Sequence, residues 1–315
     1  MIPKKPQNDN SQNTLNEVKF QQHKLMTNDI IIKLNKNGFV KQGAKTLKCG
    51  DYLKFSHQEH QLTKEQRNKL KGADFCKFRF CPMCSWRRTK NITGQLNEAL
   101  ESIEADRSIS YLFLTLTIQN PKIEDLKATV KLMNEAFKRM SKTKAYKETV
   151  IGHFKALELL GDDTKEGEAH PHFHILLIVS SSYFKSRNYI SQDKWVEMWQ
   201  KALRVDYKPV VDVRRIRPKK QSTFTALQSA VFEVAKYAVK HSELANRSDR
   251  DFTILVNQTF KMRFFSTGGE LKKKMNLLKA DEDLINFKEE TEALWVEIEE
   301  LIYKWQNGNY YLKAK

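Results

Sequence analysis

Two histidines in a short apolar stretch have the residue type and spacing that could hold a metal ion. Residues 170–179 read His-Pro-His-Phe-His-Ile-Leu-Leu-Ile-Val, which is typical of a β-strand. Side chains alternate between the faces of a strand, so His172 and His174 are expected to point the same way. His170 shares this parity, but Pro171 indicates that the strand begins there, and the role of His170 stays open. Histidines of an ordinary core or surface remain the alternative.

A glutamate on the preceding predicted strand offers a third ligand. Residues 149–160 have strand character, and a turn starts at Gly161. Within this strand, Glu158 shares a face with apolar neighbours. A carboxylate in such a place is costly unless it is paired or binds a cation. One polar loop separates the two strands, which favours an antiparallel hairpin that brings Glu158 to His172 and His174. The alternative is an edge-strand glutamate that reaches water.

All four cysteines fall in one quarter of the chain, which favours a metal site over disulfides. Cys81 and Cys84 form a Cys-x-x-Cys pair with a proline inside, a spacing that aims two thiolates at one tetrahedral zinc ion. Cys76 and Cys49 would complete the site, and His57 or His60 could replace one of them. A redox role is disfavoured because no thioredoxin-like βαβ pattern surrounds the pair.

Composition indicates an anionic partner. The chain has 315 residues, enough for about two domains, and a formal net charge of +17. Such an excess favours nucleic acid first and a membrane surface second. No apolar stretch is long enough to span a bilayer, and the polar N-terminal residues do not form a secretory signal.

Two basic runs could grip phosphates. Arg87 and Arg88 follow Trp86 at the edge of the predicted zinc turn, at the start of a helix expected to reach about residue 104. A second run begins near the end of the predicted strand 208–217 and contains Arg214, Arg215 and Arg217. Solvated faces are the alternative for both.

A predicted helix over residues 226–242 carries a tyrosine between two charged residues. Glu233 lies one turn before Tyr237, and Lys240 lies three residues after it, so all three are within reach of one another. A nearby cation favours phenolate, and a carboxylate can accept a proton. From these residues alone, a packing tyrosine is the default interpretation.

Taken in order, three motifs resemble one known family. They are Phe-Leu-Thr-Leu-Thr at 113–117, the histidine stretch at 170–177, and Glu-Val-Ala-Lys-Tyr-Ala-Val-Lys at 233–240. Together they resemble the rolling-circle replication initiators of small bacterial plasmids, within the HUH endonucleases. The similarity covers roughly residues 45–245. The subgroup that the chain resembles also has a Cys-rich N-terminal segment and a glutamate one turn before a single tyrosine.

The resemblance implies metal-dependent nicking of one DNA strand at the plasmid's double-strand origin. Tyr237 would be the nucleophile, in contact with the DNA, and would form a 5′-phosphotyrosyl intermediate. His172, His174 and Glu158 would hold Mg²⁺ or Mn²⁺. Lys240, with Lys236, would assist the phenolate or bind phosphate, and Glu233 would activate the water that ends the reaction after strand transfer.

The implied fold is α+β, with a central antiparallel sheet flanked by helices. The strand with His172 and His174 would lie beside the strand with Thr115 and Thr117. We expect four parts: a disordered or loosely held arm over 1–28, a zinc-binding segment with a linker helix over 29–104, the HUH nuclease domain over 105–248, and a helical C-terminal extension over 249–315. The extension contains residues 281–300, with nine acids and one base, which we interpret as an acidic amphipathic helix.

Expected partners are plasmid origin DNA, as a single strand or a hairpin at the nick site, and host helicase and polymerase. The setting would be the cytoplasm, with no membrane association, and the oligomeric state stays open, a dimer included. Two alternatives remain. One is a zinc-containing origin-binding regulator without catalysis, and the other is a transposase or conjugative relaxase with the same chemistry.

Overall fold

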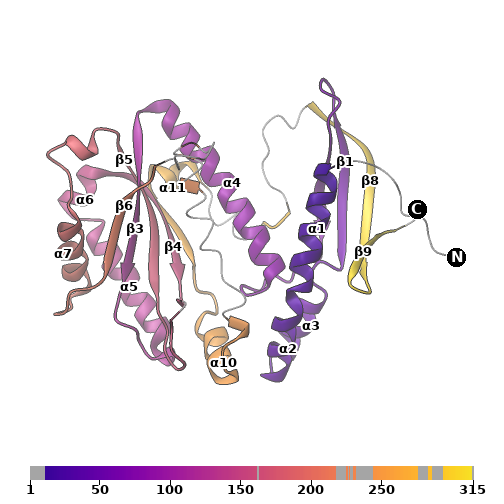
Figure 1. The fold of residues 1–315 in the computed structure, drawn as a ribbon, viewed down its shortest axis with the longest axis horizontal. Coiled ribbons are helices and arrows are strands. Elements are labelled where there is room, and N and C mark those ends of the chain that lie inside the picture. The colour runs from indigo at the N-terminus through magenta and orange to yellow at the C-terminus, as the bar shows by residue number, and fades with distance from the viewer. Residues whose placement is uncertain are drawn as a thin grey trace. The chain divides into compact units, whose positions relative to one another are not determined.

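The computed structural model describes residues 11–161, 163–217, 225, 227, 230–231, 244–275, 283–285 and 294–313, with side chains from residue 18 onward. The chain divides into two compact units. The first takes the residues up to Arg87 together with those from Asp283, and the second takes Arg88–Glu282. Each unit has an antiparallel sheet of its own (Figure 1).

The first unit contains a four-stranded sheet in the order β2-β1-β8-β9. Its strands are β1 (Tyr52–His60), β2 (Gln66–Ala73), β8 (Trp295–Gln306) and β9 (Asn309–Leu312). All pairs are antiparallel, with Tyr52 opposite Lys304 in the β1–β8 pair. The core of this unit therefore depends on a strand that comes more than 200 residues after its neighbour in the sheet.

The expected acidic helix is wrong for the part that the structure describes. Residues 295–300 form the first half of β8, whereas residues 286–293 lie outside the described part. The acidic side chains have partners across the sheet, with Glu300 paired to Lys54 and Glu297 accepting a hydrogen bond from Ser56. Backbone pairing with β1 thus overrides the helical spacing of the apolar residues.

The described part of the expected loose arm, residues 11–28, is helical, whereas residues 1–10 lie outside the described part. Residues Ser11–Leu25 form helix α1, followed by α2 (Thr27–Lys36) and α3 (Val40–Leu47). Phe20 of α1 is buried and meets Phe55 and Trp86 edge to face, with ring centroids 5.7 and 4.8 Å apart. Phe20, together with His23, which stacks on Trp86, thus anchors a segment whose composition is mostly polar.

The second unit contains a five-stranded antiparallel sheet in the order β6-β3-β5-β4-β7. Its strands are β3 (Ile109–Thr117), β4 (Val150–Glu158), β5 (His172–Ser180), β6 (Val211–Arg215) and β7 (Phe265–Gly269). Thr115 lies opposite His174 and Thr117 opposite His172, which confirms the expected neighbourhood of β3 and β5. The α+β class with antiparallel sheets and helices is confirmed.

Helices cover both faces of this sheet (Figure 1). On one face, α5 (Leu126–Met140) and α7 (Gln192–Leu203) pack against Phe173, whose ring meets those of Phe137 and Trp199. On the other face, α4 (Pro82–Asp106) and the short α11 (Glu270–Lys274) join a core cluster that includes Phe113 and Leu176. Because side chains alternate along β5, His172 and His174 share this second face with the cluster.

Shorter elements complete the second unit. They are η1 (Ile123–Asp125), α6 (Lys144–Thr149), η2 (Tyr183–Lys185) and α10 (Asp249–Gln258). The boundaries of the units differ from the expected ones, because residues 249–275 pack with the second unit whereas those from 283 onward belong to the first.

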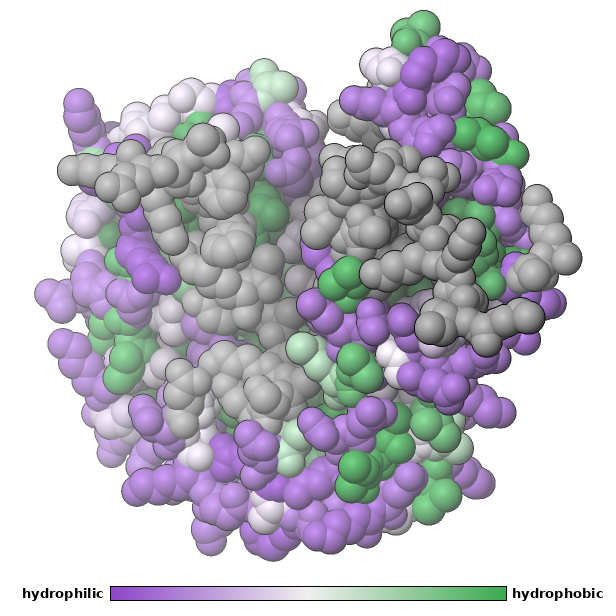
Figure 2. Space-filling model, turned by 45° about the vertical axis from the view of Figure 1, so that its right-hand side comes forward, coloured by the Kyte–Doolittle hydropathy of each residue, from purple (hydrophilic) through white to green (hydrophobic). Residues whose placement is uncertain are grey.

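Among the described residues, none of the helices combines the length and the apolar character needed to cross a membrane. In the view of Figure 2, apolar side chains form small groups among polar ones.

Candidate functional site

Glu158, His172 and His174 meet at one end of β4 and β5. Antiparallel pairing sets Glu158 opposite His172 and Ala156 opposite His174. Both histidine Nε2 atoms lie 3.1 Å from the same carboxylate oxygen, Oε2 of Glu158. Both imidazoles are buried, and the glutamate is half-buried. The hairpin therefore brings three metal-ligating side chains to a single point.

The hydrogen bonds of His172 require a proton or a metal ion between its Nε2 atom and Glu158. Its Nδ1 lies 2.8 Å from the carbonyl oxygen of His170, which can only accept, so Nδ1 carries a proton. Without a second proton, the Nε2 atom of His172 would face the Glu158 carboxylate as another acceptor. Two acceptors at 3.1 Å repel each other unless a proton or a metal ion lies between them. A backbone carbonyl that orients a histidine in this way is common behind metal-binding imidazoles.

The electrostatics also suit a divalent cation. Burial acts to raise the pKa of Glu158, but hydrogen bonds and charge interactions with His172 and His174 lower it to about 2. Burial lowers the pKa of His174. The site thus combines an ionised carboxylate with two imidazoles, a donor set that a divalent cation can use. Adjacent ligands of an octahedral ion at about 2.1 Å would lie about 3 Å apart, which the observed spacing fits.

Three neighbours support the histidines. The Oγ1 of Thr115 lies 3.3 Å from Nδ1 of His174, and the ring of Phe113 stacks on that imidazole with centroids 5.4 Å apart. His170 lies beside the cluster, with its Nδ1 2.6 Å from Oδ1 of Asn120. Asn120 was not among the residues that the sequence singled out, since only the fold brings it to His170.

The four cysteines form a second cluster, in the first unit. The Sγ atom of Cys49 lies 3.5 Å from that of Cys84 and 3.6 Å from that of Cys81, and Cys76 lies 3.6 Å from Cys84. Disulfide sulfurs would be about 2 Å apart, so these are free thiols. A tetrahedral ion with bonds of about 2.3 Å to sulfur places its ligands about 3.8 Å apart, so the cluster fits a metal ion.

Proton sharing in the cysteine cluster is uneven. Hydrogen bonds from the other three cysteines, Cys49 first, hold the pKa of Cys76 far below its usual range, whereas the pKa values of Cys81 and Cys84 are raised. A half-buried thiolate among three buried cysteines is what a bound cation would stabilise.

Neither of the two candidate substitutes for a cysteine joins the cluster. His57 Nδ1 lies 2.7 Å from Oδ1 of Asn68 across β1 and β2, and His60 Nδ1 accepts from the backbone N–H of Thr63 in the following turn. Both histidines lie on β1, whereas the thiols lie in the segments before β1 and after β2. The alternative in which a histidine replaces one cysteine ligand is therefore wrong.

The comparisons with known proteins address the whole chain. A family model described as "Replication protein" (Rep_1) matches residues 67–312, most of the chain. The chain belongs to this replication protein family. The family resemblance drawn from the motifs is thereby confirmed.

Relatives in the replication protein family match along most of their length. The chain is 33% identical to "Protein rep" of Lactiplantibacillus plantarum, over 84% of this chain and 86% of the relative. It is 33% identical to "Protein rep" of Bacillus amyloliquefaciens (87% and 85%) and 31% identical to "Protein rep" of Streptococcus pneumoniae serotype 2 (85% and 83%). No solved structure matches the chain.

The two arginines of the first basic run, Arg87 and Arg88, are buried. Arg87 and Arg88 are 3% and 6% exposed. Arg87 donates from Nε to the backbone carbonyl of Leu284, and its guanidinium lies 5.5 Å from the ring centroid of Phe20. Neither arginine is therefore exposed to a DNA strand in this structure, and the expectation that they grip phosphates stays a prediction.

The second basic run is exposed and is divided between two faces. Arg214 lies opposite Phe113 in the sheet, and its guanidinium lies 5.0 Å from that ring, on the face with His174. Arg215 points the other way and lies over the ring of Phe184, 4.5 Å from its centroid. Arg217 is also exposed. Of the three, Arg214 is placed to reach a phosphate near the metal-ligating residues.

The predicted tyrosine motif, Glu233, Lys236, Tyr237 and Lys240, lies outside the described residues. Two described residues before the motif, Leu227 and Ala230, are helical and buried in the core cluster with Phe113 and Leu176. These two residues thus pack on the face of the sheet that carries His172 and His174.

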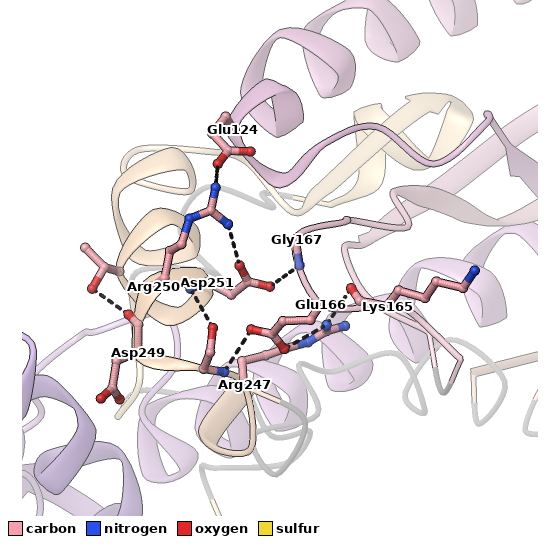
Figure 3. Close-up of polar contacts among 10 residues, drawn as sticks. Glu124, Lys165, Glu166, Gly167, Arg247, Asp249, Arg250 and Asp251 are labelled. Atoms are coloured by element: carbon pink, nitrogen blue, oxygen red, sulfur yellow. Dashed lines mark hydrogen bonds and ion pairs between the residues drawn. The ribbon is translucent and has the colours of Figure 1, made fainter.

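A polar network holds the loop between β4 and β5 to the start of α10 (Figure 3). Asp251 is fully buried and accepts a hydrogen bond from the backbone N–H of Gly167 at 2.7 Å. Arg247 donates to the carbonyl of Lys165 at 2.8 Å, and Glu166 accepts from the backbone N–H of Ser248 at 3.2 Å. The loop that joins the two ligand-bearing strands is thereby fixed. No sequence pattern indicates this network, since its partners lie more than 80 residues apart.

Proposed function

We propose that this chain initiates plasmid replication by the rolling-circle route, by nicking one strand of the origin through a covalent tyrosine intermediate. The observation that supports this most is the convergence of Glu158, His172 and His174, in which both histidine Nε2 atoms lie 3.1 Å from one carboxylate oxygen. The cation would be Mg²⁺ or Mn²⁺, which would neutralise charge on the scissile phosphate.

The reaction would exchange one phosphodiester for another. The phenol oxygen of Tyr237 bonds to phosphorus while the bond from phosphorus to the 3′-oxygen breaks. The phenol loses its proton and the departing 3′-oxygen gains one. The products are a 5′-phosphotyrosyl link and a free 3′-OH that a host polymerase extends.

Other residues would bind and release the strand. Arg214, on the same face as His174, would bind a phosphate next to the scissile one, and Lys240 and Lys236 would favour the phenolate. Strand transfer, or hydrolysis by a water that Glu233 activates, would end the round. A Glu233→Ala variant is therefore expected to nick but to terminate poorly.

The remaining proposals concern the setting. The cysteine cluster would bind one structural zinc ion, which the thiol spacing supports. Origin DNA would be the main partner, presented as a single strand or a hairpin at the nick site, with host helicase and polymerase acting after the nick in the cytoplasm.

The test is covalent trapping. The full chain is incubated with Mg²⁺ or Mn²⁺ and labelled single-stranded oligonucleotides from the origin region of its plasmid, and adducts are resolved on a denaturing gel. We expect an adduct that EDTA prevents and that Tyr237→Phe abolishes. Tyr189→Phe is the matched control, because Tyr189 is exposed and should leave the adduct unchanged. The double variant His172→Ala/His174→Ala should not be rescued by Mn²⁺.

Two outcomes would contradict the proposal. An adduct that survives in Tyr237→Phe would exclude that nucleophile. Specific origin binding by the wild type with no adduct would favour the non-catalytic regulator. A transposase or relaxase would form the same adduct, and would be separated by whether the chain supports replication of a circular plasmid carrying the origin.

A further inference from the structure

Helices α2 and α3 form a helix-turn-helix in the first unit. Only residues 37–39 separate them, and Gly38 at the turn has a φ of +80°, which glycine adopts readily. The backbone N–H of Phe39 donates to the carbonyl of Leu34 at 2.8 Å, which closes the turn. A Cβ at Gly43 of α3 would overlap the side chain of Asn35 on α2, so the helices approach closely there. Two helices joined by a three- or four-residue turn with glycine are a common duplex-binding arrangement.

Helix α3 is held rigidly at its far end as well. The buried ammonium of Lys24 on α1 donates to the carbonyls of Leu47 and Cys49 at 2.6 and 2.9 Å, where α3 ends. Cys49 in turn belongs to the cysteine cluster. A helix fixed at both ends can present side chains in a defined geometry, as recognition of a regular duplex needs.

The outward face of α3 is basic. Lys41, Lys45 and Lys48 are spaced by four and three residues and are all exposed, so they form one stripe along the helix. Among the described residues, none forms a hydrogen bond or an ion pair with their ammonium groups. Beside this stripe lie two exposed apolar side chains, Val40 (61%) and Leu47 (56%).

The lysines of α5 provide a contrast in the second unit. Lys127, Lys131 and Lys138 are also exposed, but Glu124, Asp125 and Glu135 lie among them. By comparison, residues 27–48 contain five lysines and one acidic residue, Asp29. Of the two lysine stripes, only the one on α3 therefore carries a positive charge that nearby acidic residues do not balance.

We propose that α3 is a duplex-DNA recognition helix that enters the major groove, with its lysines on backbone phosphates and with Val40 and Leu47 against base edges. An eight-residue helix is about 12 Å long, and the major groove is about 12 Å wide, so the exposed face fits. The inference rests on the proposed function in one respect, namely that the duplex is the plasmid origin. It gives the chain a duplex-binding element separate from the residues that cut a single strand.

The experiment compares two triple variants of the full chain. Lys41→Ala/Lys45→Ala/Lys48→Ala is tested against Lys127→Ala/Lys131→Ala/Lys138→Ala, which removes the same charge. Binding to a duplex fragment of the plasmid's origin region is measured by fluorescence anisotropy over a range of salt concentrations, and cleavage of the single-stranded nick-site oligonucleotide is measured in parallel.

We expect the α3 variant to bind the duplex about 10- to 100-fold more weakly at 0.1 M salt, with a salt-dependence slope reduced by about 2 to 3. The α5 variant should bind as the wild type does. Both should cleave the oligonucleotide at wild-type rates and keep the wild-type circular dichroism spectrum. Val40→Ser/Leu47→Ser should reduce the preference for origin over unrelated duplex of equal length while leaving the salt slope unchanged.

The outcomes separate this inference from the proposed function. Unchanged duplex affinity and slope in the α3 variant would overturn the inference even if oligonucleotide cleavage proceeds. Loss of cleavage in the wild type would instead contradict the proposed function. Lysine-dependent binding to phosphatidylserine vesicles, with no duplex binding, would assign the stripe to a membrane surface and overturn the inference.

Discussion

A buried lysine in the second unit gives a prediction whose size can be worked out from the structure. Lys155 of β4 is 7% exposed, and its ammonium lies 3.7 Å from the ring centroid of Phe173 and 5.1 Å from that of Phe137. It also donates to Oδ1 of Asn134 on α5. Burial lowers its pKa from 10.5 to about 7. Removing the charge should therefore change how stability depends on pH.

The sign follows from proton binding. Between pH 7 and 10.5 the unfolded chain keeps the lysine proton while the folded chain has released it, so the free energy of unfolding rises with pH in this window. The slope is about 1.4 kcal/mol per pH unit, which gives a rise of about 3 kcal/mol from pH 7 to 9.5. The two ring faces favour the ammonium form by up to about 2 kcal/mol, so we expect a rise of about 1 to 3 kcal/mol.

The assay is urea unfolding at pH 7 and pH 9.5, followed by tryptophan fluorescence. Trp195 and Trp199 are both buried in the second unit and report on its core. Lys155→Met should be more stable than the wild type at pH 7, and the difference should shrink by about 1 to 3 kcal/mol at pH 9.5. Lys147→Met, at an exposed lysine, is the control and should change stability by less than about 0.5 kcal/mol at either pH. A difference between Lys155→Met and wild type that does not vary with pH would refute the reasoning.

Two further predictions concern the metal and the DNA. Cys81→Ser should lose the bound zinc, of which we expect about one per wild-type chain by atomic absorption; full zinc retention would contradict a four-cysteine site. Arg214→Ala should weaken oligonucleotide cleavage about 10-fold or more, since its guanidinium lies on the face with His174, whereas Arg215→Ala should change cleavage less than threefold because Arg215 points to the opposite face. Equal losses of cleavage in Arg214→Ala and Arg215→Ala would contradict the inference that only the face with His174 contacts the DNA.

The parts of the candidate site that could be predicted from sequence are those set by short-range rules. Strand parity placed His172 and His174 on one face, and a hairpin with one polar loop brought Glu158 to them. Clustering in sequence likewise brought the four cysteines together. None of these inferences needed a partner from a distant part of the chain.

What could not be predicted depended on distant partners. Arg87 is buried because a carbonyl from residue 284 and a ring from α1 surround it, and nothing near it in sequence indicates either. Residues 295–300 satisfied helical spacing, yet β1 offered an unpaired edge, and backbone pairing decided the outcome. In the sequence, Asp251 looks like an ordinary acidic residue in the first turn of a helix. Its burial and its hydrogen bond with Gly167 become evident only in the folded chain.

The interleaving of the two units has a consequence for synthesis on the ribosome. All residues of the second unit are translated before β8, so the unit with the candidate nicking site can fold while β1 still lacks its neighbour. During that interval β1 is an unpaired edge strand. A copy of the chain that stops before β8 would retain Glu158, His172 and His174 but would have only part of the first unit, to which α3 belongs. Completion of the chain thus comes before full assembly of the proposed origin-binding unit.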